Sequence, residues 1–441
     1  MRVLCLSESN PDGKFIPGGG SRELIIGKNV FNQLSLAFPT DLVCPGLQKL
    51  KWHSSHRWLP SLRHFLSPTL AEITIFTIPL GGLFRTPLLA IPVLPGSYLR
   101  SLRLTFHPAD DEAFGNSASI AILQCGVFLE RLETSAQLSR AAALHLLGLR
   151  HLRTLRIGSD PPSDTVIPSY PIFPSLETLV LDNGVGHKWL FFLVAAQDNS
   201  TDGESRISEA GMITALTKLC CQGGITVDPT FISSLCIFRR LTHVFVESSC
   251  SRGGGCTFLL TDDDVTKLAD ALPNIKSLRL GSPCIANRCQ TTVFSLFTLS
   301  TRCLKLRSLE IHFNTTNIGY VLGQLFKAPQ YQAMRSLPRC PLRYLAVANT
   351  PISSRDIPAV VIYLSGIFHG LQGFRGRHRK WIEASREVRL LYNLRSHIAP
   401  DTCIVSTISF YPLCRGSSGS YLRSETTCPI GSRLGGWRRF V

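Results

Sequence analysis

The sequence predicts an α/β fold in which a parallel β-sheet forms a concave face and helices lie outside it. The main observation is an apolar phrase, L-x-x-L-x-L, that returns along most of the 441-residue chain, for example as L-R-S-L-R-L at residues 99–104. A second observation is that helical patterns precede several copies of the phrase. Strands that each follow a helix, many times in succession, favour a parallel sheet with helices along its outer side.

Eleven copies of the phrase divide the chain into repeated units. Their first residues are Leu47, Leu70, Leu99, Leu129, Leu152, Leu176, Leu216, Leu241, Ile275, Leu306 and Leu342. Successive copies are 23 to 40 residues apart, whereas regular leucine-rich repeats have periods of about 20 to 29 residues. Units of this size bury their apolar faces by stacking on their neighbours. We therefore expect an irregular leucine-rich-repeat solenoid, or horseshoe, over residues 42–370.

The unit at residues 260–280 shows why each element should form. Thr261 is a candidate helix N-cap, and the aspartates at 262–264 favour the positive end of a helix. Apolar residues at 265, 268, 269 and 272 share one helix face, Pro273 ends the helix, and the strand phrase follows. The aspartates could instead bind a cation, but capping is favoured because the apolar face begins directly after them.

Other segments are assigned by similar patterns. We expect helices at residues 228–238, 289–303 and 355–366, each ahead of a later strand. Residues 1–41 are expected to be a weakly structured N-terminal segment, and residues 398–441 a disordered tail. Between the repeats and that tail, residues 371–397 form a basic segment with a C-terminal helix over 381–397, whose apolar face is predicted to hold Ile382, Val388, Leu391 and Leu394.

Composition limits the class of protein. Hydrophobic residues make up 44% of the chain and charged residues 17%, which suits an ordered protein. No apolar run approaches the roughly 20 residues of a membrane helix, and the first residues lack the apolar core of a secretory signal. Several of the 15 cysteines, including Cys220, Cys221 and Cys236, lie in apolar phrases. We interpret them as reduced, buried thiols of an intracellular protein of the cytoplasm or nucleus, with no membrane association.

No strong catalytic, cofactor or metal motif is present. His53 with His56, and the cysteine pairs 250/256 and 284/289, lack the tight C-x-x-C spacing typical of zinc sites. There is also no P-loop, dinucleotide-binding fingerprint or H-E-x-x-H sequence. We therefore expect a protein that is not an enzyme, with no catalytic residues, cofactor or metal.

The residues between the strand leucines should point away from the core and line one concave face. Basic residues are frequent toward its N-terminal half, and aromatic and mixed residues follow. Arginine and tyrosine are enriched in protein interfaces, so we hypothesise a protein ligand that carries acidic groups; a merely solvated face is the alternative. The candidate contact residues are Lys49, Lys51, Arg103, Arg131, Arg156, His243, Phe245, Arg279, Glu310 and Tyr344.

Residues 371–441 supply +8 of the net charge of +16, because they contain 12 Lys and Arg but only 4 Asp and Glu. The run R-G-R-H-R-K at residues 375–380 is followed by Trp381. A basic cluster beside an aromatic residue is compatible with nucleic-acid binding. A solvated surface run is the favoured interpretation, so nucleic acid remains a minor alternative partner.

Three phrases resemble those of a large set of mushroom-type fungal F-box/leucine-rich-repeat proteins, whose repeats are ribonuclease-inhibitor-like. They are F-N-Q-L-S-L-A-F-P-T at residues 31–40, F-L-S-P-T-L at 65–70 and H-F-N-T-T-N at 312–317, and the resemblance covers residues 30–395. It implies a protein-binding scaffold that recognises substrates for a ubiquitin ligase, with the F-box docked on the ligase adaptor. The phrase that typically begins an F-box is not found in residues 1–45. A regulator of an enzyme, resembling an inhibitor or a GTPase activator, is the second interpretation.

Overall fold

A computed structural model of the chain describes residues 3–7, 24–25, 30, 33 and 36–38, most of 42–78, and 98–106, 112–161, 172–198, 213–247, 258–281, 290–327, 340–347 and 352–397, with short gaps within some of these ranges. The chain divides into two compact units, Met1–Leu394 and Arg395–Val441. The first unit contains all of the described residues except the end of the helix Arg379–His397, which crosses this boundary. The expected tail at 398–441 lies outside the described residues.

The described strands form one 14-stranded sheet in which every paired neighbour is parallel. The strands follow chain order across the sheet, except that β1 lies between β2 and β3. Their bounds are β1 Val3–Ser7, β2 Leu24–Ile25, β3 Lys49–Ser55, β4 Glu72–Ile78, β5 Ser101–Phe106, β6 Arg131–Thr134, β7 Thr154–Ile157, β8 Thr178–Leu181, β9 Lys218–Gln222, β10 His243–Glu247, β11 Ser277–Gly281, β12 Ser308–Ile311, β13 Tyr344–Ala346 and β14 Gly373–Arg375.

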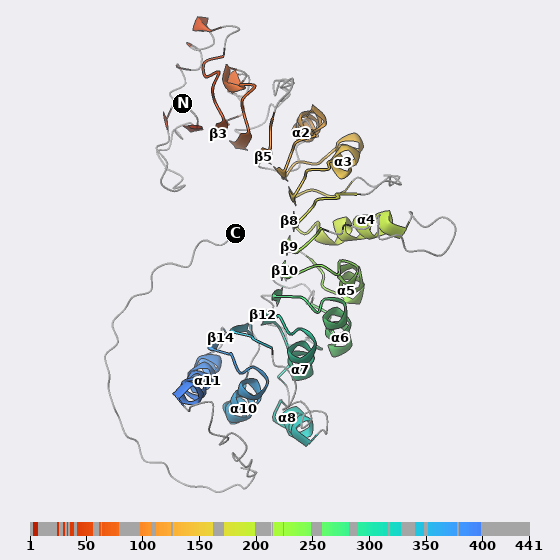
Figure 1. Cartoon of the computed structure of the whole chain (residues 1–441), viewed down its shortest axis with the longest axis vertical. Coiled ribbons are helices and arrows are strands. Elements are labelled where there is room, and N and C mark those ends of the chain that lie inside the picture. The colour runs from red at the N-terminus through yellow and green to blue at the C-terminus, as the bar shows by residue number, and fades with distance from the viewer. Residues whose placement is uncertain are drawn as a thin grey trace. The chain divides into compact units, whose positions relative to one another are not determined.

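Helices connect most of the strands from β5 onward and lie along one side of the sheet (Figure 1). No helix in the described part of the chain is both long and apolar enough to cross a membrane. The expected α/β architecture with a parallel sheet is thus confirmed. The bounds are α2 Glu112–Gln124, α3 Arg140–Leu147, α4 Gly186–Asp198, α5 Pro229–Cys236, α6 Asp262–Ala271, α7 Val293–Arg302, α8 Ile318–Lys327, the short 3-10 helix η4 Ser354–Asp356, α10 Ile357–Ile367 and α11 Arg379–His397.

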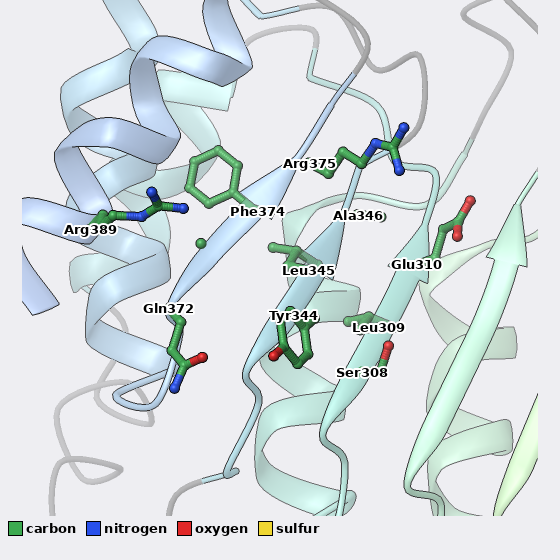
Figure 2. Close-up of a pocket in the computed structure, with 11 residues that line it drawn as sticks. Ser308, Leu309, Glu310, Tyr344, Leu345, Ala346, Gln372, Phe374, Arg375 and Arg389 are labelled. Carbon is green, nitrogen blue, oxygen red and sulfur yellow. The ribbon is translucent and has the colours of Figure 1, made fainter. Parts of the chain in front are cut away.

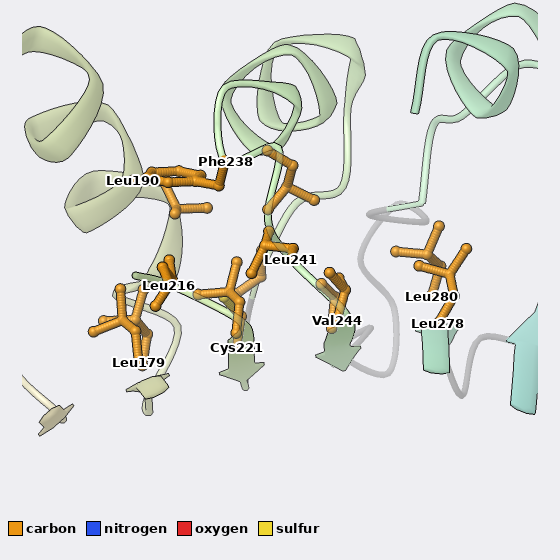
Figure 3. Close-up of a cluster of buried hydrophobic side chains, with 14 of the residues drawn as sticks. Leu179, Leu190, Leu216, Cys221, Phe238, Leu241, Val244, Leu278 and Leu280 are labelled. Carbon is orange, nitrogen blue, oxygen red and sulfur yellow. The ribbon is translucent and has the colours of Figure 1, made fainter. Parts of the chain in front are cut away.

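The core lies between the strands and the helices. In the phrase of β12, Leu306, Leu309 and Ile311 are all buried, and the same three positions are buried in β7, β8, β10 and β11. Figure 3 shows how this core continues from one unit to the next, with leucines of neighbouring strands packed below helix residues. Truncation of one such leucine to alanine removes about 2 to 5 kcal/mol of stability, so the repeated phrase is explained by packing.

Helix α6 begins as the sequence predicts. The Thr261 side chain accepts a hydrogen bond from the Asp264 amide, and the Asp264 carboxylate accepts one from the Thr261 amide in return. The helix ends at Ala271, just before Pro273. The helices expected at 228–238, 289–303 and 355–366 are also present, as the shorter α5, α7 and α10.

A hydrogen bond of Tyr363 joins units that are not neighbours. Tyr363 of α10 is fully buried, and its hydroxyl donates a hydrogen bond of 2.7 Å to the carbonyl of Val293 in α7. Helix α8 lies between these two helices in the chain. The last repeats are therefore linked across a unit.

The N-terminal segment holds strands that we did not expect. Val3 of β1 lies opposite Lys49 of β3, and Ser7 lies opposite His53. The alternation V-L-C-L places Leu4 and Leu6 on one side of the strand, where both are buried. The expectation of weak structure over residues 1–41 is therefore wrong at β1 and β2, and the sheet extends beyond the first predicted repeat.

The C-terminal helix buries a face that matches the predicted one only in part, at Val388 and, half-buried, at Leu391. Ile382 and Leu394 are exposed, whereas Trp381, Ala384 and Val388 are buried at spacings of three and four. Trp381 packs edge-to-face on Phe374 of β14, with ring centroids 5.5 Å apart. A Cβ at Gly376 would lie 2.6 Å from the Trp381 Cβ, so the approach to α11 requires glycine. The helix thus covers the core at the β14 end of the sheet, as a capping element does in a repeat array.

Candidate protein-binding face

Outward-pointing side chains form two continuous rows across the sheet, on the face that we call the open face because it lies away from α2 to α10. Pairing of the strands is in register, so equivalent positions of successive phrases are direct neighbours. Burial alternates along the strands, as the sequence predicts. The first row is Lys49, Glu72, Ser101, Arg131, Thr154, Thr178, Lys218, His243, Ser277, Ser308, Tyr344 and Gly373, and the second is Lys51, Thr74, Arg103, Glu133, Arg156, Val180, Cys220, Phe245, Arg279, Glu310, Ala346 and Arg375.

All ten candidate contact residues lie in these rows, but the cationic character expected toward the N-terminal half is largely cancelled. The Lys49 ammonium lies 2.6 Å from the Glu72 carboxylate on the next strand. The Glu133 carboxylate forms ion pairs with two guanidinium groups, that of Arg103 at 3.0 Å and that of Arg131 at 2.7 Å. The Glu133 side chain is only 8% exposed, so these pairs are partly shielded from water. An acidic ligand would have to compete with carboxylates that the sheet already supplies.

Arg156 is paired in the same way. Its Nε lies 2.5 Å from Asp182 Oδ2, and a second nitrogen donates to Oδ1 over 3.4 Å. The hydrogen bond from Arg156 to Asp182 raises the pKa of the guanidinium, against the opposing effect of burial. Lys51, in contrast, has no acidic partner among the residues that the structure describes.

Further along the sheet, Phe245, Arg279 and Glu310 form one chain of contacts. The Arg279 guanidinium carbon lies 4.2 Å from the centre of the Phe245 ring, a cation–π contact. Its Nε is 2.8 Å from Glu310 Oε2, an ion pair whose geometry falls short of a directed hydrogen bond. Burial raises the pKa of Glu310, and the charge of Arg279 opposes this shift. Arg279 and Glu310 therefore balance each other's charge, and the contacts among the three side chains hold them in place.

His243 lies at the start of β10 in the first row. Burial lowers the pKa of its imidazole, and the charges of Lys218 and Lys276 lower it further. Its Nδ1 is 2.8 Å from the hydroxyl of Thr242. The neutral form of His243 is therefore favoured, and the surrounding potential on this part of the face is positive.

A pocket of about 420 Å³ opens on the face between β12, β13, β14 and α11 (Figure 2). Tyr344, 62% exposed, lines it from β13, and Gln372 lies just ahead of β14. Arg375 and Arg389 bring two guanidinium groups from β14 and α11. A Cβ at Gly373 would lie 3.4 Å from an Arg389 guanidinium nitrogen, so the arginine of α11 lies close to β14.

Sequence reasoning named Glu310 and Tyr344 as contact residues and placed Arg375 in a basic surface run, but it predicted no pocket here and missed Gln372 and Arg389. The sequence did contain a signal for the strand that follows Gln372 and holds Arg375, because L-Q-G-F-R-G at residues 371–376 is a twelfth, degenerate copy of the strand phrase. Phenylalanine and glycine in place of two leucines concealed it. Arg389 could not be found in this way, since its place depends on how α11 packs.

Other candidate chemistry can be placed only in part. No group of three or more His, Cys, Asp or Glu side chains able to hold a metal occurs among the described residues. His56 and the cysteine pairs 250/256 and 284/289 lie outside those residues. The aromatic residue expected to support nucleic-acid binding, Trp381, is 0% exposed and cannot stack on a base. Cys221 is buried as expected, but Cys220 and Cys236 are half-buried, because Cys220 points to the open face and Cys236 ends α5.

Comparison with known proteins identified no matching family model and no matching curated protein.

Proposed function

We propose that this chain is a non-enzymatic protein-binding scaffold of the leucine-rich-repeat type, with the open face as the concave surface of a horseshoe. One observation carries the proposal, namely the pair of continuous side-chain rows that cross the sheet in register. A face built from many parallel strands offers a long, preformed surface, and such a surface suits a macromolecular ligand better than a small molecule.

Within this class we propose substrate recognition for a ubiquitin ligase as the specific role. The support is the resemblance of three phrases to fungal F-box/leucine-rich-repeat proteins. The predicted partner is a protein that lies on the open face, and a ligase adaptor is a second partner if an F-box accompanies these repeats. Regulation of an enzyme by the same face would use the same contacts.

Cross-linking with mass spectrometry tests the binding face. The full chain, tagged and expressed in a fungal host, is purified with its partners and treated with a lysine-specific cross-linker. We expect partner cross-links at Lys51 and Lys218, which are exposed on the open face. Lys267 on α6, also exposed, is the matched control on the helical side. Cross-links confined to Lys267 would refute the proposal, and recovery of a cullin adaptor would support the ligase role.

A further inference from the structure

A third row of side chains lies where the strands begin, and we call it the leading row. Each member immediately precedes a strand, and the amide of each donates to the carbonyl of the preceding member, for example Arg307 to Lys276 at 2.8 Å and Arg343 to Arg307 at 2.9 Å. From β5 to β14 the leading row is Arg100, Glu130, Arg153, Glu177, Thr217, Thr242, Lys276, Arg307, Arg343 and Gln372.

The charges of the leading row change character along the sheet. In the first half, basic and acidic residues alternate, and Arg100 pairs with Glu130 while Arg153 pairs with Glu177, each over 3.7 Å. In the second half, three basic residues follow one another on neighbouring strands. We call Lys276, Arg307 and Arg343 the basic strip. All three are exposed, and no acidic residue of the described part of the chain pairs with them.

The sequence around the basic strip contains almost no acidic residues. Residues 271–355 contain eleven Lys and Arg but a single acidic residue, Glu310, which Arg279 already engages. The segments of this region that lie outside the described residues therefore contain no Asp or Glu that could pair with the strip. This region contributes +10 to the net charge of +16, so the repeats are strongly basic here.

The basic strip also adjoins the pocket. Ser308 and Tyr344, which line the pocket, directly follow Arg307 and Arg343 in the chain, and Gln372 is both a pocket residue and the next member of the leading row. Strands in a sheet are about 4.8 Å apart, so the three cations of the basic strip span roughly 10 Å. The exposed ring of Tyr344 follows the last of them in the chain.

We propose that the basic strip and the pocket bind a short, extended acidic segment of a protein partner, with one aromatic or large apolar side chain of that segment in the pocket. This inference rests on the proposed protein-binding function and adds where the partner binds and its chemistry. Three cations beside one exposed tyrosine match a few carboxylates and one anchor residue. Single-stranded nucleic acid is normally held by a longer basic groove with several stacking aromatics.

Fluorescence anisotropy with the full chain tests the proposal. The probe is a fluorescein-labelled polyglutamate peptide with one central phenylalanine, and the competing probe is oligouridylate of matched charge. We expect the peptide to bind, more weakly at high salt, and the triple variant Lys276→Gln, Arg307→Gln and Arg343→Gln to weaken binding about tenfold. The matched control, Arg100→Gln with Arg153→Gln, changes the same row where the charges are already paired, and should leave affinity unchanged.

A second variant separates the pocket from the strip. Tyr344→Ala should weaken binding of the phenylalanine-containing peptide but not of polyglutamate alone. Equal losses in the triple variant and its control would overturn the proposal, as would tighter binding of oligouridylate or no peptide binding at all. The cross-linking experiment distinguishes failure of this inference from failure of the proposed function. If a partner cross-links to the open face and the triple variant binds it equally well, this inference is refuted while the proposed function stands.

Discussion

Asp262 joins two helices, and its removal gives the sharpest test of how the repeats hold together. Although it lies in the first turn of α6, its carboxylate accepts hydrogen bonds at the start of α7, from the Thr292 amide at 2.7 Å and hydroxyl at 2.6 Å, and from the Ser295 hydroxyl. Hydrogen bonds to a charged group contribute about 1.5 to 3 kcal/mol each. Because the site is only half-buried, water can replace part of this contribution. We expect Asp262→Ala to lower the free energy of unfolding by about 2 kcal/mol, near the upper end of the range for loss of a helix cap.

Urea denaturation measures this loss, and amide hydrogen exchange locates it. The Thr292 amide should exchange faster in Asp262→Ala because it loses its acceptor, and the first turn of α7 should follow because Thr292 is its N-cap. Asp263→Ala is the matched control, since Asp263 is exposed in the same turn and should change stability by less than about 0.5 kcal/mol. The reasoning is refuted if the two variants are equally stable, or if exchange in α7 is unaffected.

Charge reversal, pH and thiol chemistry test three other parts of the structure. Arg156→Glu should lower the free energy of unfolding by about 1 to 3 kcal/mol, because the new carboxylate faces Asp182. Exchanging the two residues, so that the acid is at 156 and the arginine at 182, should restore most of that stability in urea denaturation, and no recovery would contradict the pairing. Burial lowers the pKa of His312, so stability should fall as the pH drops below about 6.5, by at most about 1.4 kcal/mol per pH unit, and His312→Phe should reduce that slope. Burial raises the pKa of the Cys303 thiol to about 12, so a thiol reagent should label Cys303 only after unfolding, as mass spectrometry would show.

The repeated phrase predicted the sheet well because its cause is local. The spacing in L-x-x-L-x-L determines which side chains enter the core, and it correctly placed Arg103, Phe245 and Tyr344 on the outward rows. The helix at 262–271 was predictable for the same reason, since Thr261 and Pro273 mark its ends within the sequence.

Charge and exposure were predicted less well because they depend on neighbours distant in the chain. Arg103 and Glu133 are 30 positions apart in the chain and meet only because β5 and β6 pair in register, so a count of cations overstated the charge of the face. Trp381 was assigned to a surface cluster because basic residues precede it, whereas packing on Phe374 buries it. Aligning all copies of the phrase, including the degenerate one at 371–376, would have revealed the ion pairs but not the position of α11.

The bond between Tyr363 and the Val293 carbonyl also affects how the chain comes apart. In an ideal repeat array each unit contacts only the next, so units can separate one at a time. Here α10 is joined to α7 across α8, and neither can leave without breaking a contact made by the other. Under a pulling force applied at α11, this end of the chain should therefore rupture in one large step, while the units closer to β3 detach in a series of smaller ones.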